Sequence, residues 1–494
     1  MRYTSRRQFL KTLSLSGTLC VPFQTAAAGP PAQVVQFRSE IEPLVRLLEE
    51  TPRERLLEDI GLRVRQGLGY RQLLAALLLA GIRNVQPRPV GFKFHAVLVI
   101  HSVHLASRFS PESDRWLPIF WALDTFKRAQ ARDAQVGDWS MEPVVSSRVP
   151  PPHKSRQAFT EAMDQWDEAA ADAAIVGLSR AVDARQLFDL FAYYGMRDFR
   201  DIGHKAIYVA NGWRTLQTIG MQHAEPILRS LAYALLAHEG SNPATRDAEA
   251  DRPFRQNRQR IREIRSDWQT GTLSPAATVD LLDTLRHAST DDACSQVVAL
   301  LNRGIAPQSI WDALLNAAGE LMMRRPGIIA LHAVTSLNGL YFAYRTTSDD
   351  TIRRLLLLQG TAFITLFRGQ PESHPGFNID QLEPSRLEQG GPEAIDDIFS
   401  AFSYEANLIG AGKVLAFLQR KQPPERFVEA ARHLLIYKGD NSHDYKYGSA
   451  VLEDYQYLSP EWGQRYLAAS VPGLHGSASP DHALMARTQA ALRG

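Results

Sequence analysis

Cysteine is scarce in this sequence, and its scarcity excludes several kinds of site. The chain of 494 residues has only two, Cys20 and Cys294. Cys20 lies in a leader segment that we expect to be removed, so no intrachain disulfide and no thiolate-rich metal site can form. Stability must come from a hydrophobic core, and 45% of the residues are apolar. A chain of this length can build one large domain or two packed ones.

Familiar catalytic motifs are also missing. The sequence contains no glycine-rich phosphate loop, no Gly-x-Ser-x-Gly turn and no His-Glu-x-x-His. These absences disfavour the common nucleotide-dependent and hydrolytic chemistries. Any catalytic activity would therefore depend on an arrangement of side chains outside these common motifs.

Strand patterns are few, whereas apolar residues recur at helical spacing along most of the chain, as in Leu73-Leu74-Leu77-Leu78. We therefore predict an all-α fold. The apolar segment 94–105 is expected to be a buried helix. The longest later helices are expected at 155–174, 225–237, 278–287, 307–323, 328–344, 351–367 and 424–435.

Breaks in the helical pattern fall at three places: the proline run 150–152, the polar stretch 239–257 and the Gly/Pro-rich stretch 369–391. We expect 239–257 to be a long surface loop, because helical patterns of the same kind resume on both sides. No repeat of fixed period is present. The prediction is one large helical domain over residues 29–494.

The first residues have the pattern of a twin-arginine export signal. Arg6-Arg7 precedes a short, weakly apolar run that ends in Ala26-Ala27-Ala28, and we expect cleavage after Ala28. The run is too short for a permanent membrane anchor. The expected location is the periplasm or the extracellular space, with the Tat export machinery as a transient partner. This route moves folded proteins, often with a cofactor installed.

Loss of the leader would also change the charge. Residues 1–28 hold four basic side chains and no acidic one, so the formal charge falls from +2 to −2 when they are removed. The mature chain is near neutral, with no basic field for nucleic acid or an anionic membrane. We expect a small molecule as the partner.

Histidines inside apolar segments are the feature that points to chemistry. The segment 94–105 is apolar nearly all round but contains His95, His101 and His104. His101 and His104 share a helix face and His95 points nearly opposite, so at most two of them can serve one site. The alternative for each is a core histidine bonded to a carbonyl group.

Three more histidines stand in similar settings. His204 follows Gly203 where the chain re-enters a helix, and His332 lies in the middle of an apolar helix. His443 is three residues before Lys446, so the two side chains can face the same point.

Four histidines from four remote segments suit a divalent transition metal such as iron, zinc or copper. A free ammonium on Lys446 would be repelled by that metal. Carboxylation of Lys446 by carbon dioxide would turn it into an anionic oxygen ligand. The alternative is an exposed Lys446 paired with Asp444 or Glu453.

The motifs Gly203-His204, Leu331-His332-Ala333-Val334-Thr335 and His443-x-x-Lys446 resemble those of the questin oxidase-like family. The resemblance implies a helical fold and a mononuclear non-haem iron held by four histidines and a carboxylated lysine. Its characterised members oxidise aromatic polyketides such as anthraquinones. The ligands that the resemblance implies are His104, His204, His332, His443 and Lys446, with His101 as the fallback for His104. The export signal is a departure of this sequence from the pattern of the fungal members of that family.

Three functions follow as hypotheses. The favoured one is an Fe(II) oxygenase that uses dioxygen, with His443 and Lys446 at the catalytic centre. Aromatic side chains expected to line its substrate pocket are Tyr208, Trp213, Tyr341 and Tyr445. The second is a Zn(II) hydrolase on the same site, with Glu453 or Asp454 as general base. The third is a helical binding protein with structural histidines and no metal.

The export signal can be tested directly. Replacing Arg6 and Arg7 by lysine should strand a full-length precursor in the cytoplasm, because the translocation machinery reads the arginine pair. Immunoblotting of periplasmic and cytoplasmic fractions measures the distribution. Normal export of the double-lysine variant would contradict the assignment.

Overall fold

Helices make up the regular structure of the described chain. The computed structural model describes residues 34–369, 376–388, 393–402 and 407–494. Within these ranges there are no strands, only one isolated bridge between Thr272 and Ile305. The predicted all-α class is confirmed. The expected leader 1–28 and part of the stretch 369–391 lie outside the described residues.

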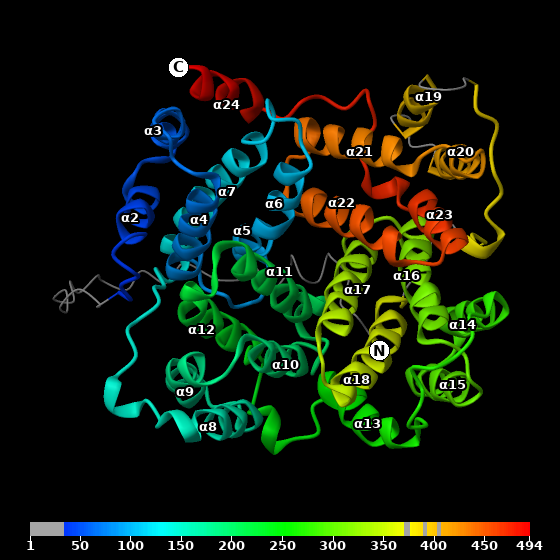
Figure 1. Ribbon diagram of the computed structural model, residues 1–494, viewed down its shortest axis with the longest axis horizontal. Coiled ribbons are helices and arrows are strands. Elements are labelled where there is room, and N and C mark those ends of the chain that lie inside the picture. The colour runs from blue at the N-terminus through cyan, green and yellow to red at the C-terminus, as the bar shows by residue number, and fades with distance from the viewer. Residues whose placement is uncertain (1–33, 370–375, 389–392, 403–406) are drawn as a thin grey trace, which may run out of the picture.

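The first half of the chain forms the helices drawn from blue to green in Figure 1. They are α2 (Glu42–Glu50), α3 (Arg53–Arg65), α4 (Tyr70–Asn84), α5 (His95–Leu98), α6 (Ile100–Arg108), α7 (Leu117–Val136), α8 (Pro152–Gln165), α9 (Glu168–Ala181), α10 (Ala184–Gly195), α11 (His204–Ile219) and α12 (Ala224–Leu235).

The second half continues from green to red. Its helices are α13 (Arg252–Arg260), α14 (Pro275–His287), α15 (Thr290–Asn302), α16 (Pro307–Arg324), α17 (Ile328–Thr346), α18 (Asp350–Phe367), α19 (Glu393–Phe402), α20 (Asn407–Gln419), α21 (Pro424–Lys438), α22 (Ser442–Asp454), α23 (Pro460–Ala469) and α24 (Leu484–Arg493). Six of the helices expected from the periodicity, from 225–237 onwards, match α12, α14, α16, α17, α18 and α21.

The helix predicted over 155–174 is wrong, because two helices replace it. Trp166 adopts a left-handed conformation with φ 57° and ends α8. The side chain of Asp167 then caps α9 by accepting a hydrogen bond from the backbone N–H of Ala170 at 3.0 Å. Apolar periodicity runs across this break, which explains the error.

Two other segments also differ from the prediction. The segment 94–105 is divided between α5 and α6, and the Leu98 carbonyl at the division accepts a hydrogen bond from the Asn211 amide at 3.0 Å. The stretch 239–257 is partly helical, because two short 3-10 turns lead into α13.

A single hydrophobic cluster runs through the described chain, from Ile41 to Ala491. Helix α24 packs against α3, so the last helix returns to the beginning of the fold (Figure 1). Helices α11, α17 and α22 lie in the middle, where α17 contacts both of the others and α11 also contacts α5 and α6. None of the helices in the described ranges combines the length and apolar composition needed to cross a membrane.

The entrance to α11 is held in an unusual backbone conformation. Asp201, Ile202 and Gly203 all have positive φ, at 53°, 49° and 83°. A Cβ atom on Gly203 would lie 2.1 Å from Oγ of Ser336, so only glycine allows α17 to approach so closely. Left-handed non-glycine residues cost about 1 kcal/mol or more each, and they persist only where surrounding packing enforces them. The direction in which α11 begins, at His204, is therefore fixed by its contact with α17.

Candidate metal centre

Four imidazole rings meet in the middle of the fold: His95, His204, His332 and His443. The Nε2 atom of His204 lies 2.8 Å from that of His332 and 3.2 Å from that of His95. The Nε2 atom of His95 lies 3.0 Å from that of His443. The rings of His332 and His443 are also neighbours, with centroids 5.2 Å apart. The ligand nitrogens of His95, His332 and His443 all lie within 4.8 Å of one another, and His204 lies against His95 and His332.

Each ring is delivered by the beginning of a different helix. His95 and His204 are the first residues of α5 and α11, and His443 is the second residue of α22. His332 lies little more than one turn into α17. Helix N-termini carry partial positive charge, which favours neutral rings over imidazolium and favours an anion at the point where they meet.

The spacing of the nitrogen atoms suits metal ligands better than a hydrogen-bonded cluster. A ring nitrogen has either one hydrogen or one lone pair, so Nε2 of His204 and of His95 cannot each make two good hydrogen bonds. Ligands at right angles around a metal with bonds of about 2.1 Å stand about 3.0 Å apart. The three contacts of 2.8, 3.0 and 3.2 Å scatter around that separation.

Backbone groups lie against the outer sides of three of the rings, and one of them makes a hydrogen bond. The Nδ1 atom of His332 donates to the carbonyl of Ile328 at 2.6 Å, which leaves its Nε2 lone pair free toward the centre. A Cβ atom on Gly91 would lie 3.0 Å from Cε1 of His204 and 3.5 Å from Cε1 of His95. Gly91, with φ 145°, thus packs its backbone against two of the rings. The Nδ1 atom of His95 has no hydrogen-bond partner within the described chain.

All four imidazoles are held neutral. Burial, and then the charge of Lys446, lowers the pKa of His95, His204 and His332 well below its usual value. The same two causes lower the pKa of His443 to about 4. The neutral ring is the form that binds a metal ion.

Lys446 lies beside this cluster, deep inside the protein. Its side chain is 2% exposed, and its Nζ atom has no hydrogen-bond partner in the part of the chain that is described. Burial lowers its pKa to about 7. The alternative of an exposed lysine paired with Asp444 or Glu453 is therefore wrong. Burying an amine without a hydrogen-bond partner is unfavourable in free energy. Its surroundings therefore favour a bound group that would supply the missing partner.

The structure corrects the choice of the first histidine. His104 lies beside Tyr70, with its Nδ1 atom 3.4 Å from the tyrosine hydroxyl, and is not part of the cluster. The fallback His101 is buried elsewhere, with both ring nitrogens unpartnered. His95 is the histidine of this segment that joins the cluster in place of His104. The two side chains face nearly opposite directions on the same segment, so only one of them can point to the centre.

The sequence contains a signal that would have favoured His95. Gly91 precedes it by four residues, much as Gly203 directly precedes His204. Both glycines have positive φ, and both allow backbone or a neighbouring side chain to come close to the site. Distance along the chain from His204 was the wrong criterion, because it carries no information on the direction of a side chain.

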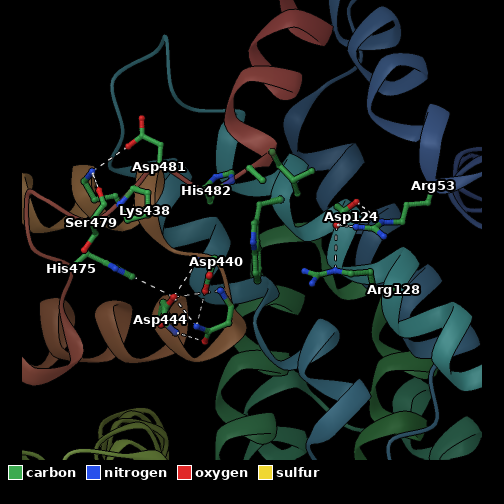
Figure 2. A pocket seen from close by; sticks show the side chains of 15 residues that line it. Arg53, Asp124, Arg128, Lys438, Asp440, Asp444, His475, Ser479, Asp481 and His482 are labelled. Atoms are coloured by element: carbon green, nitrogen blue, oxygen red, sulfur yellow. Dashed lines mark hydrogen bonds and ion pairs between the residues drawn. The ribbon is translucent and has the colours of Figure 1, made fainter.

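The position of His443 depends on the cap of α22. The Asn441 side chain accepts hydrogen bonds from the backbone N–H groups of His443 and Asp444, at 2.9 and 3.2 Å. The Asp444 carboxylate accepts from the backbone N–H of Asn441 in return, which completes a capping box. His475 lies 3.3 Å from the same carboxylate (Figure 2).

Figure 2 shows a surface cavity of about 640 Å³ that borders this cap. Its charged groups pair with each other, as in Arg53 with Asp124, Arg128 with Asp124, Lys438 with Asp481, and His475 with Asp444. None of the four clustered histidines lines it. The cavity therefore supports the start of α22 and is not itself the centre.

The aromatic residues expected to line a substrate pocket are buried in the hydrophobic core. They are Tyr208, Trp213, Tyr341 and Tyr445. Tyr208 donates to Oγ of Ser230 at 2.8 Å, and the ring of Tyr445 packs tilted against that of Trp121 with centroids 4.5 Å apart. Their packing accounts for their burial, and their role at a substrate pocket stays a prediction.

No protein-family model, no curated protein and no solved structure matches this chain. Function therefore has to follow from the residues and their geometry.

Two histidines of one segment provide a matched test of the centre. His95→Ala should lower bound metal at least about tenfold, because one ligand is removed from a set that is otherwise intact. His104→Ala should leave the metal content unchanged, since its ring lies beside Tyr70. Elemental analysis after loading and gel filtration gives the ratio of metal to chain. Equal losses in the two variants would contradict the assignment of His95.

Proposed function

We propose that this chain is an exported, mononuclear non-haem iron-dependent oxygenase that acts on an aromatic or polyketide-like small molecule with dioxygen as co-substrate. The observation that supports it most is the meeting of four neutral imidazoles beside a buried, partnerless lysine. The same function is implied by the resemblance of its short motifs to the questin oxidase-like family. Neither nucleic acid nor a permanent membrane anchor is part of the proposal.

The donor set fits iron(II). His95, His204, His332 and His443 would hold the ion through Nε2, and no thiolate competes, because Cys294 is buried against the carbonyl of Leu358. Iron bound here would supply the one-electron chemistry that lets dioxygen react with an organic molecule. The protein's own part is to hold four rings neutral and fixed, with His332 oriented by the Ile328 carbonyl.

Lys446 supplies the missing anion in this proposal. Its amine lone pair forms a bond to the carbon of carbon dioxide, one C=O π bond gives its electrons to oxygen, and one amine proton leaves to water. The product is a carboxylate on the lysine nitrogen. An anion at this point is favoured by the N-terminal ends of α11, α17 and α22, and it offsets the charge of a dication.

The outer edge of the site suits an apolar substrate. His95 and His443 are half-buried, whereas His204 and His332 are fully buried. Phe92, three residues before His95, is 59% exposed, and Ile328, four before His332, is 49% exposed. We take these exposed apolar side chains, close in sequence to two of the ligands, as support for an aromatic ligand.

The zinc hydrolase is less well supported, because its candidate bases already have partners. Glu453 pairs with Arg214 at 3.0 Å, and both Glu453 and Asp454 accept hydrogen bonds from the amide of Asn338. Burial and then the charge of Glu453 raise the pKa of Asp454 to about 8, so this carboxyl is largely protonated at neutral pH.

Metal content and dioxygen consumption test the proposal together. The mature protein, loaded with Fe(II) without oxygen, should bind about one iron per chain, because the ligand nitrogens of His95, His332 and His443 lie within 4.8 Å of one another with His204 beside them. A hydroxyanthraquinone should then raise its dioxygen consumption, measured with an oxygen electrode and by product mass. The zinc-loaded protein should be inactive in this assay. Failure to bind either metal would favour the binding protein, and ester hydrolysis by the zinc form alone would favour the hydrolase.

Lys446 has its own test. Lys446→Ala should lower iron content about tenfold or more, and added bicarbonate should not restore it, because the anionic ligand is gone. Lys446→Glu should recover part of the binding by supplying a shorter carboxylate. Elemental analysis and thermal denaturation are the measurements, with Lys127→Ala as the control for loss of a buried lysine remote from the centre. Full occupancy in Lys446→Ala would remove the lysine from the site.

A further inference from the structure

A small cavity is lined by Lys446, the lysine that lies beside the candidate metal centre. Its volume is about 10 Å³, close to the space that one water molecule needs. Polar side chains from α6, α11, α17 and α22 line it: His101, Asn211, Arg214, Asn338, Lys446 and Glu453. Polar groups thus surround a space with room for one polar atom, the size of a carboxylate oxygen.

His101 brings to this cavity a ring that is bound to nothing. The ring is buried, and neither Nδ1 nor Nε2 has a hydrogen-bond partner among the described residues. Burial, and then the charge of Arg214, keeps the pKa of this imidazole well below its usual value, so the ring is neutral. A neutral imidazole offers one donor and one acceptor. Buried polar groups are rarely left in this state, so the ring points to a ligand inside the cavity.

Lys446 brings the second unpartnered atom, its Nζ, to the same cavity. An amine offers hydrogens and at most one lone pair, so it cannot satisfy both the donor of His101 and a metal. A carboxylated lysine can, because it has two oxygens: one can face the metal and the other can accept a hydrogen bond.

The charge around the cavity also suits an anion. Arg214 lines it and is already paired with Glu453 at 3.0 Å. Asn338 holds that pair, accepting from Arg214 at 3.1 Å and donating to Glu453 at 3.0 Å. The pair is neutral overall, and the guanidinium remains available to stabilise a negative oxygen nearby.

We propose that His101 is a positioning residue that holds the carboxylated side chain of Lys446, by donating a hydrogen bond across the cavity to a carboxylate oxygen. The inference rests on the proposed carboxylation of Lys446. It gives a role to the one histidine of segment 94–105 that is neither in the cluster nor bonded to a neighbour. Its effect on the metal is indirect, through the orientation and the lifetime of the anionic ligand.

The test follows the carboxyl group itself. The mature protein, loaded with Zn(II) so that it is diamagnetic, is incubated with ¹³C-bicarbonate, and the carbamate resonance is followed by ¹³C NMR. In His101→Leu the resonance should be lost, and Zn(II) affinity, measured by competition with a chelator, should fall about 10- to 100-fold. In His101→Asn, which keeps a donor, the bicarbonate concentration for half-maximal signal should rise several-fold. The control His104→Leu, three residues away beside Tyr70, should match the wild type.

The outcomes separate the two proposals. A wild-type protein without a carbamate resonance overturns both the carboxylation of Lys446 and the role of His101. A resonance present at the same bicarbonate concentration in the wild type and in folded His101→Leu or His101→Asn overturns the role of His101 alone. If His101→Leu does not fold, His101→Asn decides, because a purely structural role would lower its melting temperature without changing its bicarbonate dependence.

Discussion

The rest of the structure depends on one constraint, the close approach of four imidazole nitrogens inside a low-dielectric core. Separations of 2.8 to 3.2 Å between Nε2 atoms leave no space for full hydrogen-bonding of each ring to its neighbours. The arrangement becomes favourable when a cation takes up the lone pairs. The four rings lie at or near the N-terminal ends of α5, α11, α17 and α22. The surrounding helices pack against these four helices and fix the positions of their N-terminal ends.

Electrostatics then decides what else the site needs. Burial keeps the rings neutral, so a dication bound by them keeps its full charge in a region that stabilises charge poorly. The N-terminal ends of the helices add partial positive charge. In the proposed function an anion offsets this charge, and Lys446 is the buried side chain beside the rings that carbon dioxide would convert into one. The cavity that joins Lys446 to His101 and Arg214 supplies the donors that such an anion would accept.

The backbone around the histidines is also shaped by their close approach. Gly91 lies against the rings of His95 and His204, and Gly203 lies against Ser336, so a side chain at either position would push the rings or the helices apart. Asp201 and Ile202 adopt left-handed conformations directly before His204. Strain of this kind is retained where packing on both sides fixes the geometry, as it does at many functional sites. The cap of α22 does the same for His443 by ordinary hydrogen bonds.

The sequence by itself determined the helical class and most of the long helices, and it picked out His204, His332 and His443, which the structure brings together with Lys446 beside them. These features are local: apolar periodicity, a glycine before a histidine, and a spacing of three residues that places two side chains on one helix face.

The tertiary structure decided the rest. It chose His95 over His104, because which face of a buried helix meets the centre depends on partners such as α11 and α17, which lie far away in the sequence. It also divided 155–174 at Trp166, since a left-handed residue interrupts the backbone without interrupting the apolar pattern. Likewise, only the folded chain brings His101 to the cavity beside Lys446, because side chains 345 positions apart share a hydrogen-bonding environment only after the helices have packed.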